Sequence, residues 1–408
     1  TCSLITFHNG YPDMDTRIGT IYPDMFPQGH TTWNTVYIDG LDTVWGTFYD
    51  NGLNLDFSLD LDFVQIKENF SNKAGADYAA SRGECLNGKI MAAYIGFEFV
   101  DAAEVVRFND DGSFNDEVTN TLLSERLQDC KTAVIPGFYG AKKDGTIVTF
   151  SIGGSDITGS LVALAVQADL YENWTDVSGF LIADPRIVKN PKSIETITYK
   201  ELRELSYMGA SVLHEDAIFP VRKAGIPINI RNTNAPQDKG TLIVEGTCRQ
   251  PKYTITGIAG TDGFVAITVE KAMMNSEVGF CRKVLQVFED NGVSIEHMPS
   301  GIDTMSIFVN KDVFEEKEQK ILADIHKAVN PDHIELESNL ALIAVVGRGM
   351  KSTRGTAGRI FSALAHAHIN VKMIDQGSSE LNIIIGVRHD DFKNAIRALY
   401  EIFVLTQI

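Results

Sequence analysis

Apolar residues recur along most of this chain at the spacing of amphipathic helices, and short apolar runs separate these helical stretches. Among the first 250 residues the period predicts helices over 59–70, 77–96, 116–129, 157–169, 199–208 and 212–224. Short apolar runs predict strands over 97–102, 132–137, 146–150, 172–178 and 227–231, with one more after the polar loop 232–240. Helices that alternate with short strands indicate an α/β sheet with parallel character.

Two features interrupt this pattern. Residues 1–55 mix aromatic residues, glycine and proline, and they keep no sustained period of 2 or 3.6. At about Gln250 the composition shifts, which indicates a domain boundary. The first 55 residues therefore predict no regular element, and the chain after Gln250 is expected to fold separately.

The residues after Gln250 contain an internal repeat. An offset of 76 residues keeps apolar and glycine positions in register, pairing Gly279 with Gly355, Phe288 with Leu364, Ile295 with Val371 and Ile307 with Ile383. Each repeat is predicted to run strand, helix, strand, strand, helix, with a last strand only in the first repeat, over 332–337. This order is typical of a ferredoxin-like βαββαβ unit. A duplicated structural module that binds no ligand also fits the repeat.

Composition and charge restrict the class of partner. With 408 residues and 44% hydrophobic residues, the chain can form two to four domains with sizeable cores. The net charge of −18 argues against nucleic acid and anionic membranes as partners. Five scattered cysteines without a Cys-x-x-Cys pair favour reduced thiols over disulfides or a zinc site. No apolar run has the length of a membrane span and no signal peptide is evident, so we expect a cytoplasmic protein.

The turn Gly153-Gly154-Ser155-Asp156 is the strongest candidate for a binding site. It lies between a predicted strand and an apolar helix, so its backbone N–H groups point out of the positive end of that helix. Such a turn binds phosphate or carboxylate groups, and glycine lets the backbone approach the anion closely. Ser155 or Asp156 is expected to cap the helix. The alternative is an ordinary strand-to-helix turn.

Two other groups of polar residues can contribute to binding. Glu84 lies on a helix whose other face is apolar, where its carboxylate can receive an ammonium group or simply pair with Lys89. Thr175 and Asp176 end a strand, and strand ends are where α/β folds bind nucleotides. Arg186, in Asp-Pro-Arg, is suited to phosphate oxygens. A polar loop without a ligand explains the strand-end residues equally well.

Several motifs occur together in one order, and with them the chain resembles an aspartokinase over about residues 55–408. They are Arg82 to Glu84, the Gly-Gly-Ser-Asp turn, Thr175-Asp176, Asp184-Pro185-Arg186, Tyr207 to His214 and Arg231-Asn232-Thr233. The resemblance implies an amino-acid-kinase α/β/α sandwich over 1–250, followed by two ferredoxin-like ACT modules over 251–338 and 339–408. It also implies transfer of the ATP γ-phosphate to the side-chain carboxylate of L-aspartate, the step that opens the route to lysine, threonine and methionine.

The resemblance assigns roles to these residues. Glu84 would bind the substrate aspartate, and Gly153, Gly154 and Ser155 would hold a substrate carboxylate or the transferred phosphate. Asp156 would organise the cations of the transition state, including Mg²⁺, so Asp156 and Ser155 form the catalytic pair. The implied ATP contacts are Thr175, Asp176, Leu181, Arg186 and Ser211, although many relatives carry lysine at the position of Ser211. No dedicated set of protein metal ligands is predicted beyond the ATP-bound Mg²⁺.

An amino-acid effector is implied for the first ACT-like module. The matching positions are Met274, Gly279, Phe280, Glu296, Ser300 and Asp303. Two acids in this set make lysine the expected effector rather than threonine. The second module lacks the acid pair, with Lys372 in place of Glu296 and Ser379 in place of Asp303, and is expected to pair subunits in a homodimer or tetramer.

Two departures from the family pattern concern cations. Relatives open with a strand that ends in Lys-Phe-Gly-Gly, which residues 1–55 lack, and they usually carry arginine where this chain has Ile152. The loss of both cations predicts a rate of phosphoryl transfer about a thousandfold or more below that of relatives that carry them. The irregular start suggests an altered upstream segment, and we expect this copy to be poorly active. A catalytically silent amino-acid sensor is the alternative function.

Overall fold

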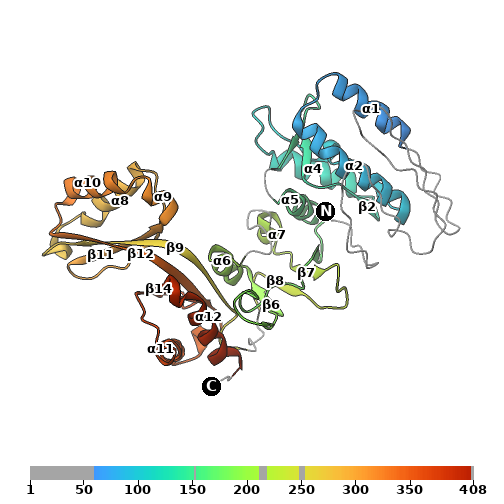
Figure 1. Ribbon diagram of the computed structural model, residues 1–408. Helices are drawn as coiled ribbons and strands as arrows, with labels where there is room; N and C mark the ends of the chain where they lie inside the picture. Colours follow the sequence, from blue (N-terminus) through green and yellow to red (C-terminus); the bar gives the residue numbers. More distant parts are fainter. Residues whose placement is uncertain (1–58, 151–152, 211–217, 248–252, 406–408) are drawn as a thin grey trace. The chain divides into compact units, whose positions relative to one another are not determined.

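The computed structural model describes residues 59–150, 153–210, 218–247 and 253–405 (Figure 1). The described residues form two compact units. The first contains residues 59–180 and 218–246, and the second contains 181–210 and 247–405. In the described part of the chain no helix combines the length and the apolar character that crossing a membrane requires.

The first unit combines short parallel strands with helices. Its strands are β1 (Glu98–Phe99), β2 (Ala133–Val134), β3 (Tyr139–Ala141), β4 (Ile147–Thr149), β5 (Tyr171–Thr175), β7 (Ile228–Asn232) and β8 (Thr241–Val244). β1 pairs with β2 and β5 pairs with β7 in parallel, as the sequence predicts. β3 and β4 form an antiparallel hairpin, and β8 runs antiparallel to β7.

Apart from one short helix that the sequence did not predict (α3, Ala102–Val105), the helices of the first unit agree with the predicted ones, with different ends. They are α1 (Asp60–Ser71), α2 (Ala76–Ile95), α3 (Ala102–Val105), α4 (Asp116–Leu127), α5 (Gly154–Ala165) and α7 (Phe219–Ala224). The strand predicted over 97–102 is shorter, because the Asp101 side chain accepts a hydrogen bond from the Ala103 N–H (2.9 Å) and starts α3. Val100, Val106, Leu123 and Tyr139 form part of the fully buried core of this unit.

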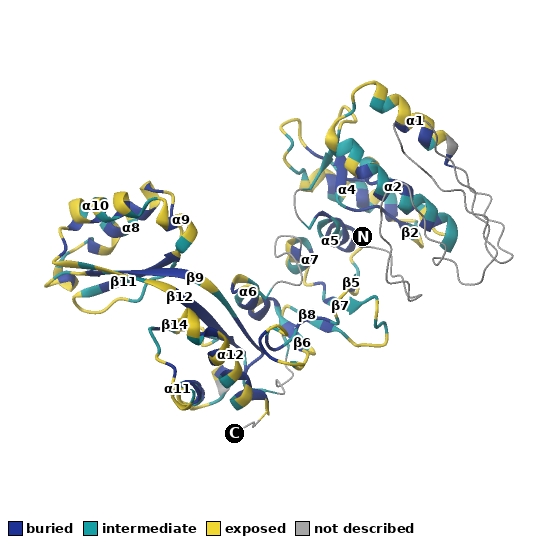
Figure 2. Cartoon of the chain, in the orientation of Figure 1, coloured by how far each residue is buried: buried dark blue, intermediate teal, exposed yellow. Residues whose placement is uncertain are grey.

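The second unit is built on one six-stranded sheet in the order β10-β11-β9-β12-β14-β13. The strands are β9 (Gly257–Glu270), β10 (Ile295–His297), β11 (Thr304–Asn310), β12 (His333–Val346), β13 (Met373–Asp375) and β14 (Asn382–Arg388). The helices are α8 (Phe280–Asp290), α9 (Lys311–Glu315), α10 (Glu318–Val329), α11 (Thr356–His366) and α12 (Phe392–Tyr400). The long strands β9 and β12 carry extended runs of buried residues (Figure 2).

The structure shows the predicted repeat and corrects its register. α8 and α11 lie 76 residues apart, and each follows a left-handed glycine with φ 82°, Gly279 or Gly355. Ile307 of β11 faces Ile267, whereas the residue of β14 that faces the equivalent Ile343 is Ile385. The offset in this strand is therefore 78 and not 76, so Ile307 corresponds to Ile385 rather than to Ile383. Two extra residues precede β14 in the second repeat.

The two repeats share their central strands. β9 pairs with the first part of β12 through Phe264–Glu270 and with its second part through Gly257–Asp262. The start of β9 thus occupies in the second repeat the place that the start of β12 has in the first. The boundary predicted between residues 338 and 339 falls inside β12, and the domain limits remain a prediction.

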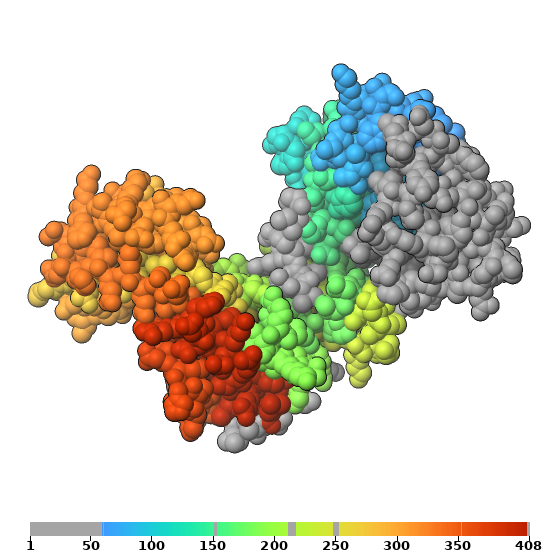
Figure 3. All heavy atoms as spheres, in the orientation of Figure 1, coloured from blue at the N-terminus to red at the C-terminus, as the bar shows by residue number. Residues whose placement is uncertain are grey.

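Residues 181–210 pack with the C-terminal residues of the second unit. This segment contains β6 (Thr196–Thr198) and α6 (Tyr199–Tyr207), and Figure 3 shows it in green beside the red C-terminal residues. The Lys192 N–H donates to the Tyr400 hydroxyl (2.9 Å), and Arg397 Nε donates to the Ile187 carbonyl (2.9 Å). Part of the stretch predicted to belong to the catalytic domain therefore stabilises the other unit.

Candidate functional site

The Gly-Gly-Ser-Asp turn forms the N-terminus of α5. Gly153 is the N-cap in the left-handed conformation (φ 62°), and among the described residues no side chain caps this helix. The expectation that Ser155 or Asp156 caps α5 is wrong, because both residues already lie inside its first turn. The helix starts at Gly154, three residues earlier than the predicted range, so the N–H groups of its first turn have no intrahelical acceptor.

Glycine at position 154 is required by packing. A Cβ atom built on Gly154 would lie 2.7 Å from the Phe138 Cβ and 2.8 Å from the Phe150 Cβ. A Cβ on Gly137 would likewise lie 3.0 Å from the Ser155 Cα. The start of α5 is therefore pressed against the segment that precedes β3, where Phe138 adopts a positive φ of 59°.

Gly154→Ala is expected to destabilise the first unit by about 1–3 kcal/mol, because the added methyl group overlaps backbone-anchored atoms that cannot rotate away. Urea unfolding of both proteins measures this difference. Gly75→Ala is the matched control, since its φ is −74° and a Cβ there meets no atom within 4 Å. Equal stability of the two variants would contradict the predicted overlap.

The Asp156 side chain is oriented by β5. Asn173 is buried on this strand, and its Nδ2 donates to Asp156 Oδ1 (2.8 Å) and to the Tyr171 hydroxyl oxygen (3.2 Å). Burial raises the pKa of Tyr171, so its hydroxyl keeps its proton. Gly159 has no Cβ and so leaves space for this hydroxyl beside α5. The sequence analysis missed Asn173, although a polar residue at a buried position of a strand was the available signal.

The end of β5 carries the predicted ATP contacts of this unit. Thr175 ends the strand, and its carbonyl accepts the Thr233 N–H (2.8 Å). Asn232 Nδ2 donates to Ser178 Oγ (2.9 Å), which tethers the loop after β7 to the loop after β5. Asp176 is exposed beside Thr175. Since Asn173 lies two residues before Thr175, one strand connects the α5 start with this loop.

Glu84 reaches the same region through α2. Its side chain is only 4% exposed and lies on the buried face of the helix. One turn later, a Cβ on Gly88 would lie 3.4 Å from the Pro136 Cβ, so α2 packs on the segment that also contacts Ser155. The structure thus places the helix of Glu84 and the start of α5 on either side of 136–138.

The other predicted nucleotide contacts belong to the second unit or lie outside the described residues. Leu181 and Arg186 belong to the second unit. Arg186 is exposed (side chain 85%), and its Nη2 donates to Asp184 Oδ2 (2.7 Å). This hydrogen bond holds the pKa of Asp184 below its usual range. Ser211 and Ile152 lie outside the described residues, as do 1–58.

The predicted effector residues come from three segments of the second unit. Gly279 is the N-cap of α8, and Met274 and Phe280 are buried in the core beneath it. The Asn275 N–H donates to the Ile302 carbonyl (3.1 Å), and the Met273 N–H donates to Asp303 Oδ1 (2.9 Å). The turn before α8 and the loop before β11 therefore lie together, and the effector role of these residues remains a prediction.

Glu296 has a partner that the sequence analysis missed. The Tyr207 hydroxyl, at the end of α6, donates to Glu296 Oε2 on β10. Partial burial and this hydrogen bond raise the pKa of Tyr207 to about 12, so the phenol is neutral at physiological pH. The carboxylate predicted to bind the effector ammonium group is therefore linked to the segment that ends just before Ser211.

Comparisons with known proteins identify similar chains for both halves. Residues 43–232 match the amino acid kinase family, and residues 343–403 match an ACT domain. Aspartokinase 3 of Bacillus subtilis is 41% identical over 337 residues, which cover 80% of this chain and 74% of the relative. Aspartokinase 1 of Arabidopsis thaliana chloroplasts is 28% identical over 347 residues, with 80% of this chain and 60% of the relative covered.

Solved structures give the same result for the fold. The aspartate kinase of Clostridium acetobutylicum is 55% identical, with a TM-score of 0.79 over 86% of this chain and 80% of that structure. Aspartokinase III of Escherichia coli in complex with lysine and aspartate is 24% identical, with a TM-score of 0.63 over 84% and 81% of the two chains. The predicted fold class is confirmed.

Proposed function

Because the chain belongs to the aspartokinase family, we propose that it transfers the γ-phosphate of ATP to the side-chain carboxylate of L-aspartate. The observation that supports this reaction most directly is the contact between β5 and α5. Asn173 holds Asp156 at a helix start with uncapped N–H groups, and the same strand ends at Thr175. A carboxylate ligand and anion-binding amides therefore lie at the end of one strand, where α/β folds bind nucleotides.

Phosphoryl transfer to a carboxylate requires the site to align two anions, and it requires no general base. The substrate carboxylate is ionised at neutral pH, so no general base has to remove a proton. The chain's part is to position two anions, with the amides of the α5 start facing one of them and Glu84 receiving the aspartate ammonium group. In the E. coli relative, a structure contains aspartate and ADP.

The residues present fit a nucleotide-bound Mg²⁺. Among the described residues no group of three or more His, Cys, Asp or Glu side chains could hold a metal ion. Mg²⁺ in phosphoryl-transfer sites needs only one or two carboxylates together with substrate phosphates, and Asp156 is such a carboxylate. Bound with ATP, the ion would neutralise charge on the transferred phosphoryl group.

Trapping the acyl phosphate with hydroxylamine tests the reaction. The purified chain is incubated with Mg²⁺, ATP, L-aspartate and hydroxylamine, and formation of aspartyl hydroxamate is measured. We expect product that requires both ATP and aspartate. L-glutamate in place of aspartate is the control. No product, or equal product with glutamate, would contradict the proposal.

The second candidate, a silent amino-acid sensor, is favoured by Ile152 at a position where relatives carry arginine. Calorimetry with L-lysine together with the hydroxamate assay separates the two functions, since the sensor binds lysine and produces no hydroxamate. We infer that lysine is the effector of either protein, because Glu296 and Asp303 suit its two ammonium groups. A structure of the E. coli relative contains lysine and aspartate. A homodimer or tetramer formed through the ACT-like modules is part of the same proposal.

Tyr207→Phe is expected to increase lysine affinity by about tenfold. The phenol competes with the effector for Glu296, and a hydrogen bond to a charged group contributes about 1.5–3 kcal/mol. Calorimetric titration of lysine measures the change. Tyr94→Phe, in the first unit, is the control and should leave the affinity unchanged. Weaker lysine binding by Tyr207→Phe would mean that Tyr207 contacts the ligand instead.

A further inference from the structure

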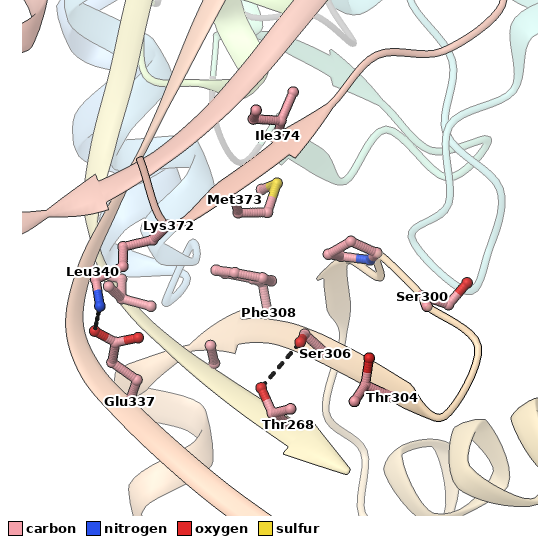
Figure 4. A pocket seen from close by; sticks show the side chains of 13 residues that line it. Thr268, Ser300, Thr304, Ser306, Phe308, Glu337, Leu340, Lys372, Met373 and Ile374 are labelled. Atoms are coloured by element: carbon pink, nitrogen blue, oxygen red, sulfur yellow. Dashed lines mark hydrogen bonds and ion pairs between the residues drawn. The ribbon is translucent and has the colours of Figure 1, made fainter. Parts of the chain in front are cut away.

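A pocket of about 290 Å³ lies on the face of the six-stranded sheet that the helices leave open (Figure 4). Side chains alternate across a strand, so Ile267 and Ile307 face the core under α8 and α10. Their neighbours Thr268 and Ser306 point to the opposite face and line the pocket. The hydroxyl groups of these two residues are 3.0 Å apart.

The two edge strands of the sheet meet beside the pocket, which remains open to solvent. His297 Nδ1 of β10 lies 2.9 Å from Asp375 Oδ2 of β13, although these strands are at opposite ends of the strand order. The sheet is therefore curved, and the pocket lies on its concave face. Ser300 of the loop before β11 and Thr304 at the start of β11 contribute to one wall, and β13 contributes the opposite wall.

The lining combines one charge of each sign with an apolar floor. Lys372 Nζ lies 2.5 Å from Glu337 Oε1, and both side chains remain partly exposed to the pocket. The floor contains Phe308 and Met373, which are 3% and 4% exposed. Figure 4 shows the Lys372–Glu337 pair and the Thr268–Ser306 pair around the same pocket. The Phe308 side chain lies between Met373 and β11, the strand that carries both Phe308 and Ser306.

The second repeat shows that these polar residues are not required by the fold. Thr268 faces Ser306, and the equivalent pair in the second repeat is Ala344 and Ile384, both buried. There α6 covers the concave face. A Cβ on Gly257 would lie 2.7 Å from the Leu205 Cδ1, and Glu204 accepts a hydrogen bond from Asn382 Nδ2 (2.5 Å).

One half of the concave face is thus apolar and covered by a helix of the same chain. The other half carries hydroxyl and charged groups, and it contains the pocket. Its volume lies just below the usual range of small-molecule pockets, about 300–1,000 Å³, so it suits a ligand of the size of one amino acid. A peptide or a helix would need a longer groove.

We propose that this pocket binds a free α-amino acid with a small uncharged side chain. The ligand carboxylate lies at Lys372 and its ammonium group at Glu337, so that four charges alternate in sign. The side chain of the ligand lies on Phe308, and the hydroxyls of Thr268 and Ser306 satisfy the remaining polar atoms. Of the six predicted effector residues only Ser300 lines this pocket, so the site is separate from the one at Glu296.

Calorimetric titration of the full chain with L-valine, L-threonine and L-methionine tests the proposal. We expect at least one of them to bind, and Lys372→Met and Thr268→Val each to weaken it at least tenfold. Isobutylamine and 3-methylbutanoate, which lack the carboxylate and the ammonium group of valine, should not bind. Binding requires neither ATP nor aspartate, so the result is independent of the kinase activity.

Two control variants separate pocket effects from general ones. Lys311→Met removes a lysine of the exposed pair with Glu315 on α9, and Glu296→Gln alters the predicted effector site. Both should retain full binding, and circular dichroism should show that all variants fold. The proposal is overturned if none of the three amino acids binds, if binding survives Lys372→Met and Thr268→Val, or if Glu296→Gln abolishes it.

Discussion

Asp156→Asn is expected to lower the rate of aspartyl phosphate formation by about 10²–10³-fold relative to the unmodified chain. The substitution keeps the size of the side chain and can retain the contact with Asn173 after rotation of the amide. It removes the negative charge at the start of α5 that is proposed to hold the nucleotide-bound cation. The loss should therefore appear in kcat with ATP and Mg²⁺, while the stability of the first unit changes little.

Asp169→Asn is the matched control, since this exposed aspartate follows the other end of α5. Hydroxamate formation is compared for the three proteins at equal protein and Mg²⁺ concentrations. A rate for Asp156→Asn within threefold of the control would remove Asp156 from the catalytic residues. Asn173→Ala should give an intermediate loss, because it leaves the carboxylate present and its position less fixed.

The sequence predicted the position of the Gly-Gly-Ser-Asp turn correctly, but not its local geometry. Two glycines between a strand and an apolar helix indicated the helix start, and β4 and α5 confirm this order. The predicted capping residue was wrong, because the backbone conformation of Gly153 determines where the helix starts. Gly153 adopts the left-handed conformation and is the N-cap, two residues before Ser155 and three before Asp156.

The alternation of side chains along a strand made the repeat visible in the sequence, and it also concealed the error of two residues in the register. Side chains in a strand alternate with a period of two, so a slip of two residues leaves every apolar position on the same face. The pairing of Ile307 with Ile383 therefore looked correct in the sequence. Only the hydrogen-bonded register, in which Ile385 faces Ile343, shows the two extra residues.

The contacts that could not be predicted join segments far apart in the sequence. Tyr207 donates to Glu296, and Thr268 lies near Lys372 only because the sheet is curved. A single sequence reports local periodicity, and neither the curvature of a sheet nor the position of α6 on it is a local property. The sequence placed Glu84 opposite the apolar face of its helix, whereas its side chain is 4% exposed on the buried face of α2 and Lys89 pairs with Asp62.

Glu201→Gln is expected to destabilise the second unit by about 3–5 kcal/mol, because it removes one partner of a buried ion pair. The Glu201 side chain is 0% exposed and belongs to a capping box with Thr198 at the start of α6. Its oxygens accept hydrogen bonds from Thr256 Oγ1 (2.6 Å), from the Arg348 N–H (2.8 Å) and from Arg348 Nη1 (2.8 Å). One carboxylate thus connects α6, the start of β9 and the loop after β12.

The same carboxylate should make this stability depend on pH. Burial by itself raises the pKa of Glu201, but the hydrogen bonds from Thr256, Arg348 and Thr198 outweigh it, and the net pKa is lowered. A carboxyl group whose pKa is lower in the folded state stabilises that state at pH values above its unfolded pKa, about 4.3. This stabilisation is lost as the pH falls from the unfolded pKa through the folded pKa. The stability difference between the unmodified chain and Glu201→Gln should therefore be constant near pH 7 and shrink below about pH 4.

Hydrogen exchange of the β9 and β12 amides measures the stability of this unit separately from the other. Glu315→Gln is the matched control, because its exposed pair with Lys311 on α9 should contribute less than about 0.5 kcal/mol. If Glu201→Gln lowers protection no more than the control does, the hydrogen bonds of Glu201 contribute little net stability. A difference that persists unchanged at pH 3 would mean that the lost packing of α6, and not the charge of Glu201, determines the effect.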